Sequence, residues 1–280
     1  MKYKNFKISH VNTKSQWSRA LLVETALLGQ GLPSVNNSRL AEQWPDSKRI
    51  NLLWLDNGRI VAGGLDDFLE IRQKTWLQRV DDRRLEQAIA TSKSGFLTAS
   101  AVMRIAAGTG AFLVVTAGMG GIRGSVVSAD LLCLINLPLL LIATAPKDSQ
   151  DLSLTVDYLR RNNVRVIGNN TDMCFGFLFK GKQVLLDGKY QEGYLQSITE
   201  KGVLLLNPLP PDSLIADREL LLKSMAKGEE AIKNCGDYHP AVNKSLDRAT
   251  QGRLSFLQLQ SLIKNIGVGL ALTINPILNA

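Results

Sequence analysis

Histidine and cysteine, two side chains that often bind transition metals, are scarce in this chain. Its 280 residues include only two histidines, His10 and His239, and three cysteines, Cys133, Cys174 and Cys235. No two cysteines form a Cys-x-x-Cys pair, which excludes a zinc site of that kind and a disulfide framework. Two histidines also exclude a histidine-rich metal centre. Unpaired cysteines are typical of a reducing compartment, so we expect a cytoplasmic protein.

The chain also lacks a long apolar run. Residues 1–7 contain no apolar core of the kind that a secretory signal needs. The most apolar stretch, residues 131–144, is shorter than the roughly 20 residues that cross a bilayer. Asn136 and Pro138 interrupt it. We therefore expect no signal peptide, no membrane-spanning helix and no membrane partner.

A basic stripe with interleaved aromatic residues, which would indicate nucleic-acid binding, is missing too. Lysine and arginine outnumber aspartate and glutamate by 33 to 25, a net charge of +8, but this excess is scattered along the chain. It fits a solvated basic surface or a basic cleft for an anionic small molecule. We expect a small-molecule partner and no nucleic acid.

The glycine-rich segment 117–124 does not match the common nucleotide-binding motifs. Gly118 and Gly120 are followed by Arg123 where a dinucleotide fingerprint has its third glycine, and no acidic residue stands at the right distance. No Gly-Lys-Ser/Thr follows, which excludes a P-loop. The backbone amides of such a turn can still bind a phosphate; the alternative is a tight turn without a ligand.

Around these glycines the chain has a regular alternation of strands and helices. An apolar run covers 111–116, a helix begins near Asp130, a second apolar run covers 137–144, and a helical pattern covers 151–159. Parallel α/β sheets bind ligands beyond the carboxyl ends of their strands. We therefore expect the glycine turn, Asp130 and Lys147 to face one cleft.

The same alternation extends over the whole chain. The turn at Asn57 and Gly58 lies between two alternating segments and predicts a β-hairpin. The expected buried strands are 20–25, 51–56, 111–116, 137–144, 164–168 and 203–207, and the main expected helices are 83–90, 97–107, 151–159, 214–234, 240–250 and from 254 onward. With no repeat and no linker-like stretch, we predict a single α/β domain over residues 1–280. It should have three α/β/α layers around a largely parallel or mixed central sheet.

Two side chains of this framework have chemistry that a cleft could use. Glu24 ends an apolar strand and could be a general acid or base, or merely a helix cap or a surface ion pair. Lys147 follows Pro146 in an apolar neighbourhood, where a partly dehydrated amine could be a nucleophile; the alternative is a solvated lysine. The neighbouring Asp148 would favour the charged amine, so it should turn away from the cleft.

Short motifs in a fixed order make the chain similar to a known family. The matching segments are ALLVE…GLP at 20–33 (ALES…HGMP in the family), GMGGI at 118–122 (GGIGGV), SADL at 128–131 (SADL), the segment 147–159 (KSILDIPATLEYL) and NPLP at 207–210 (ANPIP). Over roughly residues 20–210, the chain resembles the pseudouridine-5′-phosphate glycosidase family, also called indigoidine synthase A-like.

The resemblance implies a reaction on a C-nucleotide. In that family a lysine forms an imine with C1′ of the ribose 5-phosphate unit, and the bond to uracil breaks reversibly. A glutamate and an aspartate-bound divalent metal, typically manganese (Mn²⁺), assist. By position, Lys147 corresponds to the imine lysine, Glu24 to the acid or base and Asp130 to the metal ligand. Thr98 and Ser128 fall where the family binds substrate, Thr98 near the phosphate. The resemblance also implies a homotrimer.

The chain departs from the family pattern at several polar positions. Arg79 stands where the family has a lysine, Arg123 replaces the histidine of GGVHRG, and Gln30 replaces that of HGMP. Because arginine binds phosphate well, we expect Arg79 and Arg123 to line the phosphate end of the cleft. Because arginine stays charged and cannot transfer a proton, turnover should be slow or absent even where the imine forms. The family's C-terminal asparagine has two candidates, Asn265 and Asn275.

Three functions follow from this pattern. The chain could be a divergent glycosidase that cleaves pseudouridine 5′-phosphate to uracil and ribose 5-phosphate. It could be a related enzyme of specialised metabolism that forms C-glycosyl bonds, or a catalytically impaired relative that binds a sugar phosphate. The retention of Glu24, Asp130 and Lys147 favours the two enzymes over the third reading.

Overall fold

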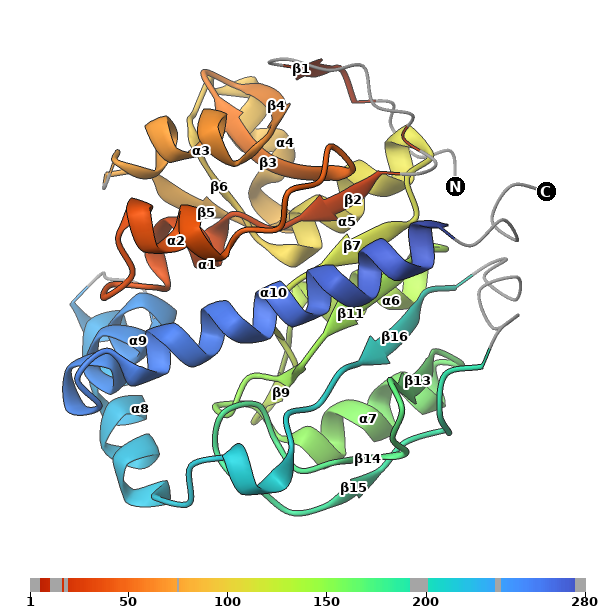
Figure 1. The fold of residues 1–280 in the computed structure, drawn as a ribbon, viewed down its shortest axis with the longest axis vertical. Coiled ribbons are helices and arrows are strands. Elements are labelled where there is room, and N and C mark those ends of the chain that lie inside the picture. Colours follow the sequence, from red (N-terminus) through yellow and green to blue (C-terminus); the bar gives the residue numbers. More distant parts are fainter. Residues whose placement is uncertain are drawn as a thin grey trace.

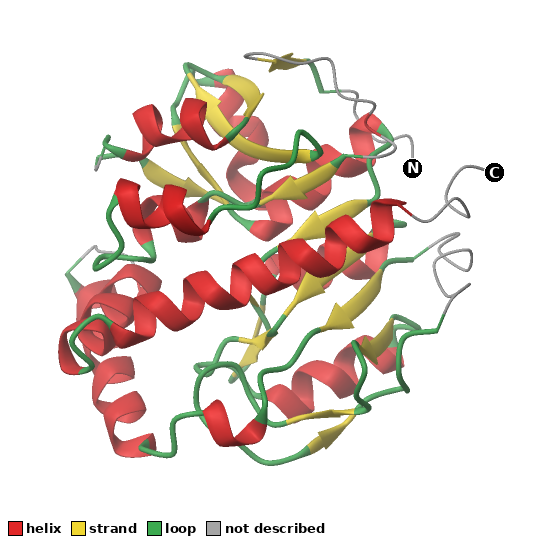
Figure 2. Ribbon diagram, viewed as in Figure 1, coloured by secondary structure: helices red, strands yellow, loops and turns green. Residues whose placement is uncertain are grey.

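A computed structural model describes residues 6–10, 17, 20–74, 76–191, 201–234 and 238–274, and one large sheet forms its middle layer (Figures 1 and 2). The strands of this sheet are β1 (Ile8–His10), β2 (Leu21–Val23), β3 (Ile50–Asp56), β4 (Arg59–Gly63), β5 (Gln78–Val80), β6 (Gly95–Leu97), β7 (Leu113–Val115), β11 (Leu140–Ala143), β13 (Arg165–Gly168) and β16 (Val203–Leu206). Its main path runs β1-β4-β3-β2-β7-β11-β16-β13, and β6 and β5 branch from β3.

The sheet is mixed, with a long parallel part. All neighbours from β3 through β2, β7, β11 and β16 to β13 are parallel, whereas β4 and β6 are antiparallel to β3. The β3–β4 hairpin turns at Asn57 and Gly58, whose φ angles of 48° and 73° suit a two-residue hairpin turn. The predictions of a largely parallel or mixed sheet and of this hairpin are confirmed.

Helices cover both faces of the sheet and complete the three layers. The longest, α10 (Arg253–Ile274), crosses one face, where it packs on β2, β7 and β11 (Figure 1). On the other face α5 (Ala99–Thr109) packs on β2 and β7 and against α6 (Ala129–Asn136). The remaining helices are α1 (Ala26–Gln30), α2 (Asn37–Gln43), α3 (Leu65–Arg72), α4 (Asp82–Ala90), α7 (Leu152–Arg161), α8 (Arg218–Lys233), α9 (Tyr238–Ala249) and the short 3-10 turn Pro211–Ser213.

The parallel strands form the centre of the hydrophobic core. Every residue of β2, β7, β11 and β16 is buried, because helices cover both faces of these strands. This double covering explains why their sequences read as continuous apolar runs instead of alternating ones. Helix α10 lies so close to the sheet that a Cβ on Gly269 would come within 2.6 Å of Leu21.

Some local predictions differ from the structure. Leu97, expected as the first residue of a helix, instead ends β6, which lies between β3 and β5, since pairing with two strands outweighs its local preference. Helices α1 and α2 were not predicted. The glycine-rich segment contains short strands instead of a free turn: β8 (Gly118–Met119) pairs with β12 (Ala145–Pro146), and β9 (Ile122–Arg123) pairs with β10 (Val126–Val127). Another small hairpin joins β14 (Met173–Cys174) and β15 (Val184–Leu185).

Two expectations concern membranes and cysteines. In the described part of the chain, no helix is long and apolar enough to cross a membrane. Cys133 and Cys174 are buried and free. Cys235 and Asn275 lie outside the described residues.

Candidate active site

A cleft of about 300 Å³ lies beyond the carboxyl ends of the central strands. Glu24 enters it directly after β2, Lys147 directly after β12, and Asp130 from the first turn of α6. Parallel strands place their carboxyl ends on one edge of a sheet, which is why side chains from distant segments meet here. The structure thus brings together the three residues that the sequence singled out for chemistry.

Glu24 is a buried carboxyl group, 3% exposed, and is held by one short contact. The Thr116 hydroxyl, just after β7, donates a hydrogen bond of 2.5 Å to Glu24 Oε1. Burial raises the pKa of Glu24, while the charge of Lys147, the Thr116 hydroxyl and the charge of Arg79 act in the opposite direction. A carboxyl group of this kind keeps its proton to a higher pH than usual and can serve as a general acid.

Behind Glu24 lies a chain of buried amides. Asn265 of α10, fully buried, donates to the Thr116 carbonyl at 2.8 Å and to Thr144 Oγ1 at 3.1 Å. Its own Oδ1 accepts from Asn207 Nδ2 at 3.0 Å. Asn265 therefore ties α10 to the ends of β7, β11 and β16, and supports the residue that holds Glu24. Of the two candidate asparagines, it is the one that the structure connects to the cleft.

Lys147 has an amine that the surroundings push towards the neutral form. Loss of water lowers its pKa most, and the positive charge of Arg79 lowers it further. Glu24 and Asp130 oppose this shift. Because only the neutral amine attacks a carbonyl carbon, the cleft favours Lys147 as a nucleophile.

Asp148 turns away from this amine, as predicted. Its carboxylate accepts the backbone N–H groups of Phe177, Leu178 and Phe179 at 3.1, 3.0 and 3.2 Å. Burial raises the pKa of Asp148 to about 6, and the three amides and Arg218 oppose the rise. The side chain that could have suppressed the nucleophile instead orders the segment 177–179.

This raised pKa predicts a pH-dependent contribution to stability. Asp148 titrates at about 6 in the folded protein and near 3.8 when unfolded, so the folded state retains a proton in this interval. The stabilisation is complete below pH 3.8 and is lost as the pH rises to 6. It corresponds to at most about 3 kcal/mol. We expect the free energy of unfolding of the wild type, relative to Asp148→Asn, to fall by up to this amount between pH 4 and pH 7. Urea unfolding of both proteins at each pH measures the difference, and parallel pH profiles would contradict the assignment.

Asp130 and the glycine segment are bound to each other. Gly120 N–H donates to Asp130 Oδ2 at 2.6 Å, and Ile122 N–H donates to Thr155 Oγ1 at 2.9 Å. These two amides of the glycine segment are therefore not free to bind a phosphate. Glycine is required at 120 because a Cβ there would approach Ser128 Oγ to 2.7 Å. The Ser128 hydroxyl, at the edge of the cleft, has no hydrogen-bond partner among the described residues.

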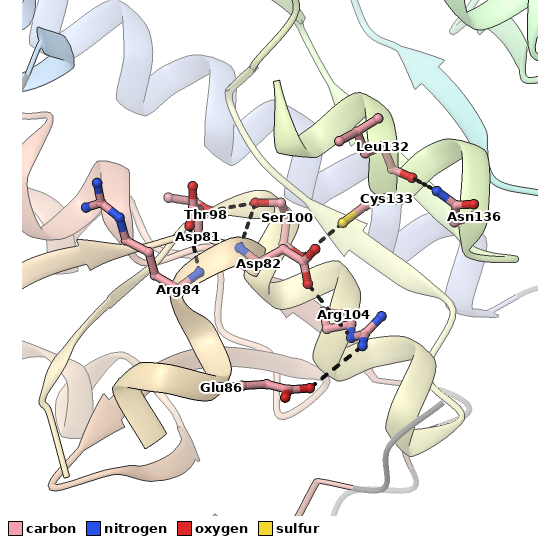
Figure 3. Close-up of polar contacts among 10 residues, drawn as sticks. All are labelled: Asp81, Asp82, Arg84, Glu86, Thr98, Ser100, Arg104, Leu132, Cys133 and Asn136. Atoms are coloured by element: carbon pink, nitrogen blue, oxygen red, sulfur yellow. Dashed lines mark hydrogen bonds and ion pairs between the residues drawn. The ribbon is translucent and has the colours of Figure 1, made fainter. Parts of the chain in front are cut away.

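The other wall of the cleft is formed by β5 and the first turns of α4 and α5. Thr98, the N-cap residue of α5, shares a hydrogen bond of 3.1 Å with Ser100, whose hydroxyl also accepts Asp82 N–H at 3.3 Å (Figure 3). The Asp81 carboxylate caps α4 by accepting Arg84 N–H. The two helix N-termini are thus fixed against each other, and their positive ends favour a bound anion.

Arg79 supplies a cation beside this wall. Its side chain lines the cleft and, within the described residues, makes no hydrogen bond or ion pair. Its charge nevertheless acts on Glu24, Lys147 and His239. Arg84, which the sequence did not single out, lines the same cleft.

The prediction that Arg123 lines the phosphate end beside Arg79 is wrong. The β9–β10 hairpin carries Arg123 away from this cleft, towards α8. There its guanidinium pairs with Glu229 at 2.5 Å and lies 4.2 Å from the centre of the Tyr238 ring. The charge of Arg123 was expected to bind phosphate, but it already interacts with the Glu229 carboxylate and the Tyr238 ring.

Sequence reasoning missed His239, which lines the cleft from the first turn of α9. Burial lowers its pKa well below the usual value, and the charges of Lys147, Arg79 and Arg123 lower it further. The scarcity of histidine was the available signal: a lone His-Pro step at the start of a helical pattern could have been flagged. Its distance in sequence from every other site residue hid the connection.

A larger hollow of about 780 Å³ also has Lys147 in its lining, together with residues of the segment 175–184 and Arg218. Glu24, Asp130 and Arg79 do not reach it. The 300 Å³ cleft is therefore the better candidate, since Glu24, Lys147 and Arg79 line it together.

Comparison with known proteins identifies the family of this chain. A protein-family model described as "Indigoidine synthase A like protein" matches residues 19–274. The pseudouridine-5′-phosphate glycosidases of Salinispora tropica and Thermotoga petrophila are each 26% identical; the matches cover 87% of this chain in both cases, and 82% and 90% of the relatives. That of Myxococcus xanthus is 28% identical over 71% of this chain and 73% of its own.

Solved structures show the same fold. The indigoidine synthase A-like protein of Thermotoga maritima superposes with a TM-score of 0.80 at 22% identity, over 96% of both chains. The prealnumycin C-glycosynthase AlnA, in complex with ribulose 5-phosphate, gives 0.74 at 21% identity, over 96% of this chain and 97% of its own. With the family model matching nearly the whole described sheet and its covering helices, the chain belongs to the indigoidine synthase A-like protein family.

Proposed function

We propose that this protein is a divergent pseudouridine-5′-phosphate glycosidase that breaks the C-glycosidic bond reversibly, to give uracil and ribose 5-phosphate, through an imine on Lys147. The observation that carries the proposal is the pairing, in one cleft, of an amine whose pKa is lowered with a carboxyl group whose pKa is raised. These are the nucleophile and the acid that imine formation requires. The names of the curated relatives support the substrate.

Each wall of the cleft has a separate task in this reaction. The phosphate would bind between the Arg79 guanidinium and the N-terminus of α5, where Thr98 lies. Lys147 would then attack the sugar carbon C1′, and Glu24 would give its proton to the departing oxygen. Asn265 and Thr116 would hold Glu24 in place.

Arg79 also has an electrostatic role in the cleft. It cannot carry a proton, but its fixed charge lowers the pKa of Lys147. The Arg79 charge thus favours the neutral nucleophile, while arginine at this position removes a possible proton carrier. This is the reason to expect that imine formation survives and that turnover is slow.

The two arginines should differ in their effect on phosphate binding. We expect Arg79→Ala to weaken the binding of ribitol 5-phosphate, which has the phosphate but no carbonyl group, by roughly one to two powers of ten. A charge-assisted contact contributes about 1.5–3 kcal/mol. Arg123→Ala, the matched control, should change the affinity less than twofold or so because Arg123 faces Glu229. Isothermal calorimetry measures the affinity of both variants. An equal loss of affinity in the two would show that Arg123 also binds the phosphate.

A divalent metal, for which we propose Mn²⁺, would be held by Asp130. The described residues contain no group of three His, Cys, Asp or Glu side chains that could enclose a metal ion. A single carboxylate fits a hydrated ion that keeps most of its waters, and the Ser128 hydroxyl, which has no partner in the described part of the chain, lies beside it. When bound, such an ion would polarise oxygen atoms of the substrate.

We expect Asp130→Asn to lose Mn²⁺ binding, since it removes the one charged ligand. Electron paramagnetic resonance of free Mn²⁺ in a titration measures this directly. Asp81→Asn, which removes a carboxylate from the opposite wall of the same cleft, is the control and should keep the site. If Asp130→Asn still binds Mn²⁺, Asp130 is not a metal ligand.

The activity itself is tested by mixing the protein with pseudouridine 5′-phosphate and Mn²⁺ and measuring free uracil. Release of uracil that Lys147→Ala abolishes supports the glycosidase. Covalent capture of ribose 5-phosphate without uracil release would favour the second reading, a C-glycosyl-bond-forming enzyme with another aglycone. If the protein neither captures ribose 5-phosphate nor releases uracil, the result favours a non-catalytic relative.

Assembly and compartment are separate proposals. The family resemblance supports a homotrimer, and light scattering would then give three times the chain mass of 30.7 kDa. The free, buried Cys133 and Cys174 support a cytoplasmic location, which cell fractionation would test.

A further inference from the structure

His239 places the one described imidazole of the cleft next to the proposed nucleophile. It lines the 300 Å³ cleft together with Lys147 and Glu24. It also bounds, again with Lys147, a narrow cavity of about 30 Å³ beside the cleft. The aromatic ring of Tyr238 meets the imidazole edge to face, with ring centres 5.3 Å apart, and so limits its rotation.

The surroundings keep this imidazole neutral. The groups that act on it are all cationic: Lys147, Arg79 and Arg123. Burial acts in the same direction, so the pKa of His239 lies well below its usual value. A neutral imidazole has both a donor and an acceptor nitrogen and can take up one proton while releasing another.

The other side chains of the cleft are less suited to move a proton at Lys147. Arg79 and Arg84 are arginines, and a guanidinium group does not transfer protons in a protein. Asp130 already accepts Gly120 N–H through one oxygen. Glu24 has one proton to give and, after giving it, is an anion. A second group is needed, because forming an imine moves a proton from nitrogen to oxygen before water leaves.

We propose that His239 is the proton relay of imine formation at Lys147, a role that rests on the proposed function. The neutral Lys147 amine adds to the carbonyl carbon, and the C=O electron pair moves to oxygen. His239 takes one proton from the resulting ammonium nitrogen and passes it to that oxygen, which gives a neutral carbinolamine. The protonated Glu24 then donates its proton to the hydroxyl group, which leaves as water. The nitrogen lone pair forms the C=N bond, and the iminium ion faces the Glu24 carboxylate.

The test compares the wild type with His239→Ala, His239→Gln and the control Lys244→Ala, an exposed cation on the same helix α9. Each full-length protein is mixed with ribose 5-phosphate, and samples are reduced with borohydride at increasing times. Intact mass spectrometry gives the rate of adduct formation. Calorimetry with ribitol 5-phosphate gives the binding of the phosphate alone.

We expect both His239 variants to form the adduct about 100-fold more slowly, with unchanged ribitol 5-phosphate affinity. Added imidazole should restore part of the rate of His239→Ala, in which the space is open, and none of the rate of His239→Gln. Lys244→Ala should match the wild type. An unchanged rate in the His239 variants would overturn the inference, and so would a slower rate with weakened binding and no imidazole rescue. If the wild type itself forms no adduct, the proposed function fails, and the relay fails with it.

Discussion

Lys147→Ala is expected to abolish covalent capture of ribose 5-phosphate completely. In the wild type, borohydride should reduce the imine and add the mass of ribose 5-phosphate less one oxygen atom. The reason is the amine itself: loss of water and the charge of Arg79 both lower the pKa of Lys147, so a neutral nucleophile is available near neutral pH. Intact mass spectrometry measures the adduct, and peptide mapping should place it on Lys147.

The controls for this experiment separate chemistry from folding. Lys223→Ala removes a lysine that is 73% exposed and does not line the cleft, and it should keep full labelling. Lys147→Arg retains a positive charge in the cleft but no attacking amine, and it should not be labelled. An unmodified wild type, folded and supplied with Mn²⁺, would support the non-catalytic reading. Labelling at any other lysine would contradict the assignment of Lys147 as the imine-forming residue.

Glu24→Gln is expected to slow adduct formation by about 10²- to 10⁴-fold, the usual contribution of a general acid. Gln has nearly the same shape and can still meet the Thr116 hydroxyl, but it has no proton to give. Because burial raises the pKa of Glu24, the acid form persists above the usual pH range. The wild-type rate should therefore fall as the pH rises through this raised pKa. The variant should lack that decline.

The pH series also distinguishes the loss of a general acid from unfolding of the variant. A buried carboxyl group with a raised pKa contributes stability below its unfolded pKa, and that stability is lost as the pH rises through the folded pKa. Replacing it by an amide should therefore not unfold the protein near neutral pH. Glu42→Gln, at an exposed ion pair with Arg39, is the matched control and should leave the rate unchanged. A high-pH decline that survives in Glu24→Gln would show that another group is the acid.

Much of the fold could be predicted because each strand of the parallel sheet has a local sequence pattern, and this pattern recurs along the chain. Strands covered by helices on both sides are apolar throughout, so the runs that become β7, β11 and β16 stand out. The misses occurred where pairing with distant segments decided the conformation. Residues 95–97 became β6 because β3 and β5 accept it on both sides. A window of local sequence does not contain that information.

The candidate site could be predicted only where a side chain follows a strand. Glu24 and Lys147 each stand directly after a buried strand, and Asp130 begins the helix after one. Parallel strands carry such positions to one edge of the sheet whatever the details of packing. Arg79 and Thr98 also reached the cleft, but from β5 and the end of β6, which belong to the antiparallel branch of the sheet and do not follow this rule.

The tertiary structure alone decided which of the remaining polar groups meet. Arg123 was directed to Glu229 and Tyr238 by a hairpin whose orientation depends on α8. His239 and Asn265 reached the site because α9 and α10, more than 90 residues beyond Lys147, fold back over the strand ends. Local sequence therefore determined the strands and the residues at their ends, since those depend on near neighbours. The partners of those residues depend on contacts between segments far apart in the chain, and only the folded molecule brings them together.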